Sequence, residues 1–427
     1  MNRLTENKRL FFSALDFFAW ASLAASSYDY IFCTQQVGFS NSQIGMLFAV
    51  NGLLGIISQP LCGIISDYVK SVRKVLLACM SVSILTSILL TMFQSKTAVV
   101  PLILTYTLFT ASFMPLLDNW IARECAKEQG YHYGMIRIWG SIGFAIVVYI
   151  YGKLTEIYNV SNVYYGRALL FAVTMFLVFL YKYEDLQSGY KTHGKASATS
   201  DAAAEAPDKG KPDIKALLST KRYITFMIFV FIINLPMNCS YTFFPSLLFS
   251  VGGTNSTVGL VSSLNAFIEI PFFLYSRKLA DRIGSRGLIL LACGFLALRM
   301  LGFYLAPSIG LLMASYWLMA PYTSFFTPGM LYYIYSLAPE NTEAFAQTLV
   351  QAFAAGTAGM LGNSFAGFFV DRYGVRPLYG YGSMIIIFGI LFFYLSGLQL
   401  SRKSRTKPAT AFSLLHSKKC NSTFDKN

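Results

Sequence analysis

Long apolar runs recur along the whole chain of 427 residues, separated by short polar breaks. A helix needs about 20 residues to cross a hydrocarbon core of roughly 30 Å, and the runs have about this length. Strands of a membrane barrel would alternate apolar and polar residues, which these runs do not do. The pattern therefore predicts an all-α membrane protein with twelve transmembrane helices. The predicted helices lie near residues 10–33, 43–65, 74–94, 98–121, 134–154, 164–182, 223–249, 257–277, 287–305, 308–335, 344–369 and 378–399.

One polar stretch divides these helices six and six. Residues 183–220 are rich in Lys, Asp, Glu, Ala, Ser and Gly, a composition that cannot bury a core. We therefore predict four regions along the chain. They are an N-terminal six-helix bundle (1–182), a flexible cytoplasmic linker (183–220), a C-terminal six-helix bundle (221–400) and a disordered basic cytoplasmic tail (401–427).

The two predicted bundles contain a repeated sequence. NSQIGMLFAVNGLLGI begins at Asn41 and NSTVGLVSSLNAFIEI begins at Asn255, an offset of 214 residues that also aligns Asn51 with Asn265. Both segments open the second helix of their bundle. Internal duplication is typical of transporters that build two pseudo-symmetric bundles around a central site.

The net charge of +14 could indicate a nucleic-acid partner, but its distribution argues otherwise. With a cytoplasmic N-terminus, 27 of the 34 basic residues fall on the cytoplasmic side. The outer loops then hold Lys96, Lys153, Arg167, Arg372 and Arg376. The positive-inside rule thus predicts a multi-pass protein of the cell (plasma or inner) membrane, with both termini in the cytoplasm and no nucleic acid bound. The seven cysteines show no metal-binding spacing, so we expect neither a metal nor a cofactor.

Six ionisable residues lie inside the predicted helices. They are Asp16, Asp29, Asp118, Glu269, Arg137 and Arg299. Each costs about 2.5–3.5 kcal/mol on insertion scales, so such residues usually face a cavity and have a function. Their number predicts that the chain moves a polar solute through the membrane.

Two pairs of these charges flank cytoplasmic turns at similar depth. Asp118 and Arg137 both lie roughly 8–11 Å into the bilayer, whereas Glu269 lies about eight residues deep and Arg299 about twelve, near the midplane. Two structural salt bridges are one interpretation, but buried pairs rarely improve on apolar packing. We favour a role in transport, in which the arginines bind substrate. Glu269 is then the first candidate for the proton carrier.

Other polar and aromatic residues extend this candidate site. Asp118 and Asp16 are the further proton-coupling candidates, whereas Asp29 lies close to the outer end and could be solvated. The equivalent residues Asn51 and Asn265 are candidate substrate ligands. Trp139 could stack on a sugar or aromatic ring, and Trp20 is a further aromatic candidate.

An acid followed by basic residues ends the second helix of each bundle. The residues are Asp67, Arg73 and Lys74 in the first bundle and Asp281, Arg282 and Arg286 in the second. Each turn alone could be a solvated loop that obeys the positive-inside rule. Their recurrence at matching positions favours a pair of gating loops on the cytoplasmic side.

This motif resembles that of the major facilitator superfamily. The residues that carry the likeness are Gly63, Asp67, Arg73 and Lys74, in QPLCGIISDYVKSVRKVLL. This segment, YGMIRIWGSIGFA and DRIGSRGLILLACGFLALRMLGF resemble the lactose permease group of oligosaccharide–proton symporters. PLLDN, YGMIRIWGS and IEIPFF are similar to the related branch of phenylpropionate (aromatic-acid) and nucleoside permeases. The resemblance implies the major facilitator fold.

The same resemblance implies functional roles for individual residues. Arg137 matches the substrate-binding arginine of helix 5, and Arg299 matches the arginine of helix 9. Phe144 stands where the sugar permeases place a tryptophan. Met319 and Tyr322 stand where they place the His and Glu of proton coupling, so the detailed proton route differs.

These observations predict a secondary active transporter, not an enzyme. The favoured function is proton-coupled symport by alternating access, importing a small polar solute such as a sugar or oligosaccharide. Its partners would be the solute, the proton and the lipid bilayer, and it would act as a monomer. The alternatives are a nucleoside or aromatic-acid symporter and a drug or metabolite exporter. A non-transporting sensor is less favoured, because a scaffold has little use for intramembrane charges.

Overall fold

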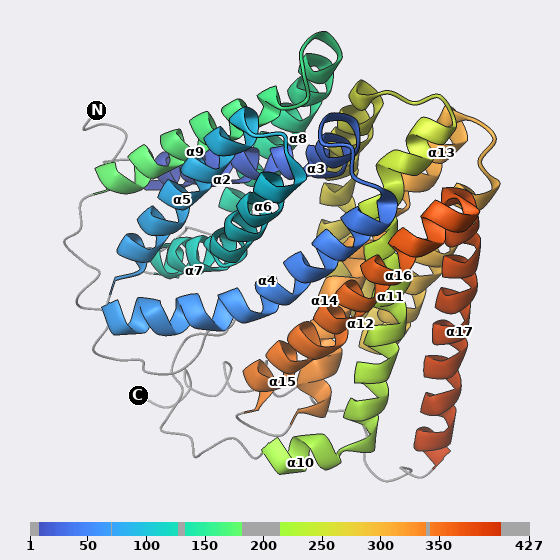
Figure 1. The fold of residues 1–427 in the computed structure, drawn as a ribbon. Coiled ribbons are helices and arrows are strands. Elements are labelled where there is room, and N and C mark those ends of the chain that lie inside the picture. Colours follow the sequence, from blue (N-terminus) through green and yellow to red (C-terminus); the bar gives the residue numbers. More distant parts are fainter. Residues whose placement is uncertain (1–7, 70, 127–132, 182–213, 339–341, 403–427) are drawn as a thin grey trace, which may run out of the picture.

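The computed structural model describes residues 8–69, 71–126, 133–181, 214–338 and 342–402. Within these ranges every regular element is a helix, which confirms the predicted all-α class. The predicted tail lies almost wholly outside the described residues, as does most of the predicted linker. Figure 1 shows the blue-to-green helices of the N-terminal half beside the yellow-to-red helices of the C-terminal half.

Each half is a chain of long helices with short connections. The N-terminal half contains α2 (Lys8–Leu23), α3 (Asp29–Ile31), α4 (Asn41–Val69), α5 (Val72–Met92), α6 (Lys96–Thr110), α7 (Phe113–Ala126), α8 (Tyr133–Ile157) and α9 (Asn162–Leu180). The C-terminal half contains α10 (Ile214–Ser219), α11 (Lys221–Ser250), α12 (Asn255–Leu305), α13 (Ile309–Trp317), α14 (Met319–Leu337), α15 (Glu343–Leu349), α16 (Thr357–Tyr373) and α17 (Val375–Arg402). A 3₁₀ turn at Ala24–Tyr28 joins α2 to α3, and a π-helical turn at Val350–Gly356 joins α15 to α16.

The helices accommodate the twelve predicted crossings. Ten stretches of the described residues are long and apolar enough to span a membrane. One of them, α12, contains two crossings, because Gly284 has a φ of 74° and reverses the chain. Glycine tolerates this left-handed backbone, which other residues avoid. α13 and α14, interrupted at Leu318, together cover the predicted helix at 308–335.

The two halves meet closely at one end of the bundle. We call this the distal end; it holds the connections at residues 37–40, 158–161, 251–254 and 374, and lies opposite the start of α2. There α4 packs on α16, and α8 packs on α12. A Cβ on Gly259 would lie 2.6 Å from the Val148 carbonyl oxygen and 3.1 Å from the Gly152 Cα. Gly45, the repeat equivalent of Gly259, approaches the α16 backbone in the same way. The backbones of the two halves therefore approach each other closely at two equivalent crossings at the distal end.

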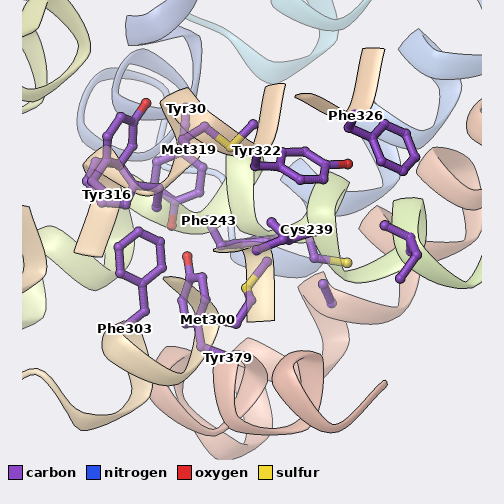
Figure 2. Close-up of a cluster of buried hydrophobic side chains, with 14 of the residues drawn as sticks. Tyr30, Cys239, Phe243, Met300, Phe303, Tyr316, Met319, Tyr322, Phe326 and Tyr379 are labelled. Atoms are coloured by element: carbon purple, nitrogen blue, oxygen red, sulfur yellow. The ribbon is translucent and has the colours of Figure 1, made fainter. Parts of the chain in front are cut away.

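Buried aromatic residues also join the halves near this end. One hydrophobic core runs through both halves and includes Tyr30 of α3 and Phe243 of α11, whose rings are 5.8 Å apart. Both rings are labelled in Figure 2. A second core, which includes Phe12 and Trp120, belongs to the N-terminal half. The halves therefore share a core that includes this distal contact.

The assignment of Arg167 to an outer loop is wrong. Arg167 lies inside α9 and is 1% exposed, with its Nη1 3.9 Å from Asp29 Oδ1. Its Nε donates to Ser87 Oγ at 2.8 Å, and its guanidinium lies 3.8 Å from the ring centroid of Tyr106. Asp29 also accepts a bond from the Tyr164 hydroxyl at 2.9 Å, so it is not a solvated rim residue. A carboxylate and aromatic faces replace water around the guanidinium.

We expect Asp29→Asn to destabilise the fold. Removing one partner of a buried ion pair leaves the other charge uncompensated, which costs about 3–5 kcal/mol. The thermal unfolding midpoint in detergent should fall clearly below that of the wild-type protein. Lys153→Gln, which removes an exposed charge from α8, should leave the midpoint unchanged. An Asp29→Asn variant as stable as the wild type would contradict the pairing.

Candidate functional site

A cavity of about 330 Å³ lies between the two halves. Its walls come from α2, the turn after it, and α8 on one side, and from α11, α12 and α13 on the other. Its polar lining residues are Ser27, Arg137, Ser141, Ser262, Asn265 and Glu269. Its aromatic lining residues are Trp20, Phe144, Tyr241, Phe244 and Tyr316. The structure thus brings three of the predicted residues, Arg137, Asn265 and Glu269, to one cavity.

Helical spacing explains why the polar residues share the cavity. Ser141 follows Arg137 by four residues on α8. Ser262, Asn265 and Glu269 follow one another by three and four residues on α12. Residues at these spacings lie on one face of a helix. Sequence reasoning missed the two serines although this spacing could have found them.

The aromatic lining residues have a weaker signal in the sequence. Sequence reasoning missed Tyr241 and Tyr316, because both lie in apolar runs that are already rich in aromatic residues. Nothing in such a run distinguishes a ring that faces a cavity from one that packs in the core. Trp20, named only as a further aromatic candidate, does line the cavity.

Arg137 packs beside Gly140 of α8, and we call the space left by the missing Gly140 side chain the notch. Its guanidinium lies 3.7 Å from the ring centroid of Trp20, and its Nη1 lies 3.5 Å from Ser141 Oγ. A Cβ on Gly140 would lie 2.5 Å from Trp20 Cδ1 and 3.0 Å from Arg137 Nη1, and it would clash with Asp16 Oδ2. Only the absence of a side chain at Gly140 allows these three groups to converge.

Three of the predicted carboxylates lie near Arg137. Asp16 meets it at Gly140, Glu269 lines the same cavity, and Arg137 is close enough to act electrostatically on Asp118. Asp16 is fully buried, and neither of its carboxylate oxygens has a hydrogen-bond partner among the described residues. Glu269 accepts a bond from Thr323 Oγ1 at 3.0 Å. Within the described chain, no ion pair of 4.0 Å or less joins Arg137 to these acids. The predicted Asp118–Arg137 salt bridge is therefore not formed.

The expected pair of Glu269 with Arg299 is wrong. Arg299 is fully buried and donates from Nη1 to Ser240 Oγ at 2.8 Å. Its guanidinium lies 4.6 Å from the ring centroid of Phe303 and 5.2 Å from that of Tyr316. Figure 2 shows these two rings in the buried cluster. Arg299 points toward α11 and α13, whereas Glu269 points toward α14. Two residues at similar depth on neighbouring helices can still lie on helix faces that point away from each other. Arg299 does not line the cavity, although the neighbouring Tyr316 does.

Two other predicted ligands lie elsewhere. Trp139 is 48% exposed and is not part of the cavity lining. Asn51 does not line the cavity either, and its buried Oδ1 has no partner among the described residues. Its repeat equivalent Asn265 does line the cavity, and its Oδ1 is also without a partner in the described chain. The two halves therefore contribute unequally to the site.

The predicted gating arginines make equivalent contacts within their own halves. Arg73 Nη2 donates to the Phe179 carbonyl at 2.6 Å, and Arg286 Nη2 donates to the Phe393 carbonyl at 2.5 Å. Phe179 and Phe393 are related by the 214-residue offset. Of the other predicted gating residues, Lys74, Asp281 and Arg282 are exposed, and the side chain of Asp67 lies outside the described residues. The gating role of these loops stays a prediction.

Known proteins are similar in sequence to this chain over most of its length. The model of the MFS_1 like family matches residues 10–381. The maltose permease of Geobacillus stearothermophilus is 25% identical over 396 residues, covering 92% of this chain and 94% of the permease. The sucrose permease of Escherichia coli is 26% identical over 310 residues, covering 68% of this chain and 69% of that protein.

The fold also matches a solved structure. The crystal structure of the nucleoside transporter NupG superimposes with a TM-score of 0.76 at 17% sequence identity, covering 91% of this chain and 99% of NupG. This match confirms the predicted fold, and the family match confirms the resemblance drawn from the motif after the second helix. The chain belongs to the MFS_1 like family of the major facilitator superfamily, and it is a multi-pass membrane transporter of small solutes that needs no cofactor and is not an enzyme.

Proposed function

We propose that this transporter is a proton-coupled symporter that takes up a small neutral polar solute, with a sugar or oligosaccharide as the first choice. The observation that carries the proposal is the cavity between the halves, which Arg137 lines from one side and Glu269 from the other, with Asp16 beside Arg137. In the topology predicted from the positive-inside rule, the distal end faces outward. The structure then corresponds to the state closed to the outside.

The charge balance of the cavity favours a neutral solute. The sequence predicts two arginines at the cavity, but Arg299 is fully buried and does not line it. Arg137 is therefore the one basic residue among the described lining residues, and Glu269 balances it, so no spare positive charge is left for an anionic solute. The serine hydroxyls and the Asn265 amide suit the hydroxyl groups of a sugar.

Competition for Arg137 couples the solute to the proton. Solute hydroxyls that engage Arg137 draw its charge away from a neighbouring carboxylate. The carboxylate then takes a proton, and the loaded cavity crosses the membrane without an uncompensated charge, whose cost is several kcal/mol. Asp16, Asp118 and Glu269 are the candidates for this proton.

Trp20 supplies the aromatic platform in this proposal. The sugar permeases that the chain resembles stack a tryptophan of helix 5 on the sugar ring, and Phe144 stands at that position. Trp20 faces the same cavity from α2 and already stacks on Arg137. The maltose and sucrose permeases among the relatives support a sugar as the solute.

A nucleoside or an aromatic acid is the second candidate solute. Phe144, Tyr241 and Tyr316 place aromatic rings on both sides of the cavity, which suits a planar base. The structural likeness to a nucleoside transporter is consistent with this alternative, although at 17% identity it shows the fold alone.

An uptake assay tests both candidates. The protein is reconstituted into liposomes, an inward proton gradient is imposed, and labelled sugars, nucleosides and aromatic acids are offered in turn. Accumulation of one class that a protonophore abolishes supports the proposal and identifies the solute class. Absence of uptake for every class, together with efflux of a dye, would contradict it in favour of an exporter.

We expect Gly140→Ala to impair transport by roughly 10²-fold. The added Cβ displaces Asp16, Trp20 or Arg137, and a misplacement of about 1 Å can cost this much in a preorganised site. The initial rate of uptake is the measurement. Gly294→Ala is the matched control, because a Cβ there has nothing within 4 Å, and its uptake should equal that of the wild type. Equal rates in both variants would show that the notch has no role.

A further inference from the structure

The repeated segments that begin with Asn41-Ser42 and Asn255-Ser256 both lie at the distal end, and neither Asn41 nor Asn255 lines the cavity. One segment opens α4 at Asn41 and the other opens α12 at Asn255, and both helix starts lie at the distal end. The first N–H groups of a helix have no partner within the helix, and the helix dipole makes this end attractive to a carboxylate. Each of these two helix starts receives a carboxylate from the opposite half.

Asp371, in the last turn of α16, caps α4. Its Oδ1 accepts from the backbone N–H of Asn41 at 3.1 Å and from Asn41 Nδ2 at 2.9 Å. Its Oδ2 accepts from the backbone N–H of Ser42 at 2.7 Å and from Ser42 Oγ at 2.5 Å. We call this set of four hydrogen bonds the Asp371 cap.

Glu156, in the last turn of α8, caps α12 in the corresponding way. Its Oε1 accepts from Thr254 Oγ1 at 2.5 Å and from the backbone N–H of Ser256 at 3.2 Å. We call these two hydrogen bonds the Glu156 cap. Asn255 meanwhile pairs with Gln35 of the other half through two amide contacts at 3.4 Å. Glu156 and Asp371 are 215 residues apart, one residue from the offset of the repeat.

The origin of each carboxylate decides what the caps do. A cap from the same half would stabilise its helix in every state of the transporter. A cap from the opposite half exists only while the distal ends are together, so it stabilises that state over the one in which they have separated. A contact made in one state shifts the equilibrium toward that state. Charge-assisted hydrogen bonds of this kind are about twice as strong as neutral ones.

We propose that Asp371 and Glu156 are gating residues whose inter-half caps hold the distal entrance closed and set the balance between the two states of the transport cycle. Exposed surface ion pairs contribute little to stability. These carboxylates differ because each accepts several donors, including backbone N–H groups at fixed positions. The caps also lie within one turn of Gly45 and Gly259, where the backbones of the halves meet. Distal opening must break both caps as these crossings separate.

The test measures access to the cavity from each side of the membrane. Ser262, on the cavity wall, is replaced by cysteine, and the protein with its seven native cysteines but without Ser262→Cys is the blank. A membrane-impermeant thiol reagent is added to one side of sealed proteoliposomes at a time. We expect Asp371→Asn combined with Glu156→Gln to speed labelling from the distal side by about tenfold or more. Asp371→Asn alone should act more strongly than Glu156→Gln alone, since Asp371 accepts four bonds and Glu156 accepts two.

Two controls separate gating from a general effect of charge or folding. Lys153→Gln and Arg372→Gln each remove an exposed charge from the same turns and should leave distal labelling unchanged. Should the double variant not fold, Ser42→Ala removes one donor of the Asp371 cap and should produce a smaller shift in the same direction. Thermal unfolding of each variant confirms that labelling reports on folded protein.

Unchanged distal labelling in the folded double variant would overturn the proposal. An equal increase of distal labelling in Lys153→Gln and Arg372→Gln would also overturn the proposal, because a change of surface charge alone would then explain the faster labelling. The assay uses neither a solute nor a proton gradient. Its outcome is therefore independent of whether the protein is a proton symporter.

Discussion

Replacing Arg137 with lysine is expected to reduce proton-driven uptake by roughly 10²-fold or more, although the positive charge is kept. A guanidinium is planar, stacks on aromatic faces and directs several N–H groups at once, whereas an ammonium is a compact point charge. Arg137 uses all of these properties, since it stacks on Trp20 at 3.7 Å and neighbours three carboxylates. Lysine would keep the charge but lose the stacking and the shared geometry.

The measurement separates binding from turnover. Initial uptake rates over a range of solute concentrations give the apparent KM and the maximal rate, and calorimetry gives the affinity of the solubilised protein. We expect the affinity to fall together with the rate, because the arginine contacts the solute in the proposed mechanism. Arg372→Lys is the control, since Arg372 is exposed and is not part of the cavity lining. Wild-type uptake by the Arg137→Lys variant would remove Arg137 from the site.

The sequence was sufficient to predict the features that depend on the pattern along a single helix, such as the membrane crossings and their turns. Apolar run lengths predict the crossings, and the break at Gly284 falls inside the turn expected at 278–286. Intramembrane charges were expected to face a cavity, and Arg137 and Glu269 both line one.

The faces of the helices could not be predicted in the same way. Successive residues of a helix point in directions about 100° apart, and the orientation of each helix depends on its neighbours. Arg299 therefore faces Ser240 and two aromatic rings instead of Glu269, and Trp139 is half exposed. Arg167, close enough to a helix end to be counted as a loop residue, turns inward to Asp29.

The surroundings of Arg167 and Arg137, two arginines of the N-terminal half, differ in which half supplies the nearby carboxylates. Asp29 and Arg167 belong to the same half, so their pair moves as a unit and needs no change during transport. Asp16 and Asp118 likewise share a half with Arg137. Glu269 alone among the three carboxylate neighbours belongs to the C-terminal half. Rocking of the halves must change its relation to Arg137, which is the property that a coupling acid requires.

Glu269→Gln is therefore expected to abolish uphill accumulation while solute exchange continues. For one proton per solute, a gradient of one pH unit supports about tenfold accumulation, because both correspond to about 1.4 kcal/mol. The Glu269→Gln variant should reach a ratio of about one, since glutamine keeps a hydrogen-bonding group toward Thr323 but cannot exchange a proton. Counterflow between preloaded and external labelled solute should stay within a few-fold of the wild type, because exchange requires reorientation of the loaded site but no net proton movement.

Asp16→Asn and Asp118→Asn provide the comparison that makes this result specific. Both remove a carboxylate beside Arg137, but neither crosses the boundary between the halves. We expect them to alter solute affinity through the position of Arg137 while accumulation persists at a reduced rate. If the Glu269→Gln variant accumulates solute and one of the asparagine variants does not, the proton belongs to that acid, and the carboxylate in the opposite half serves the solute instead. The proton would then travel on the same half as the arginine, and coupling would have to act through the solute that bridges the two halves.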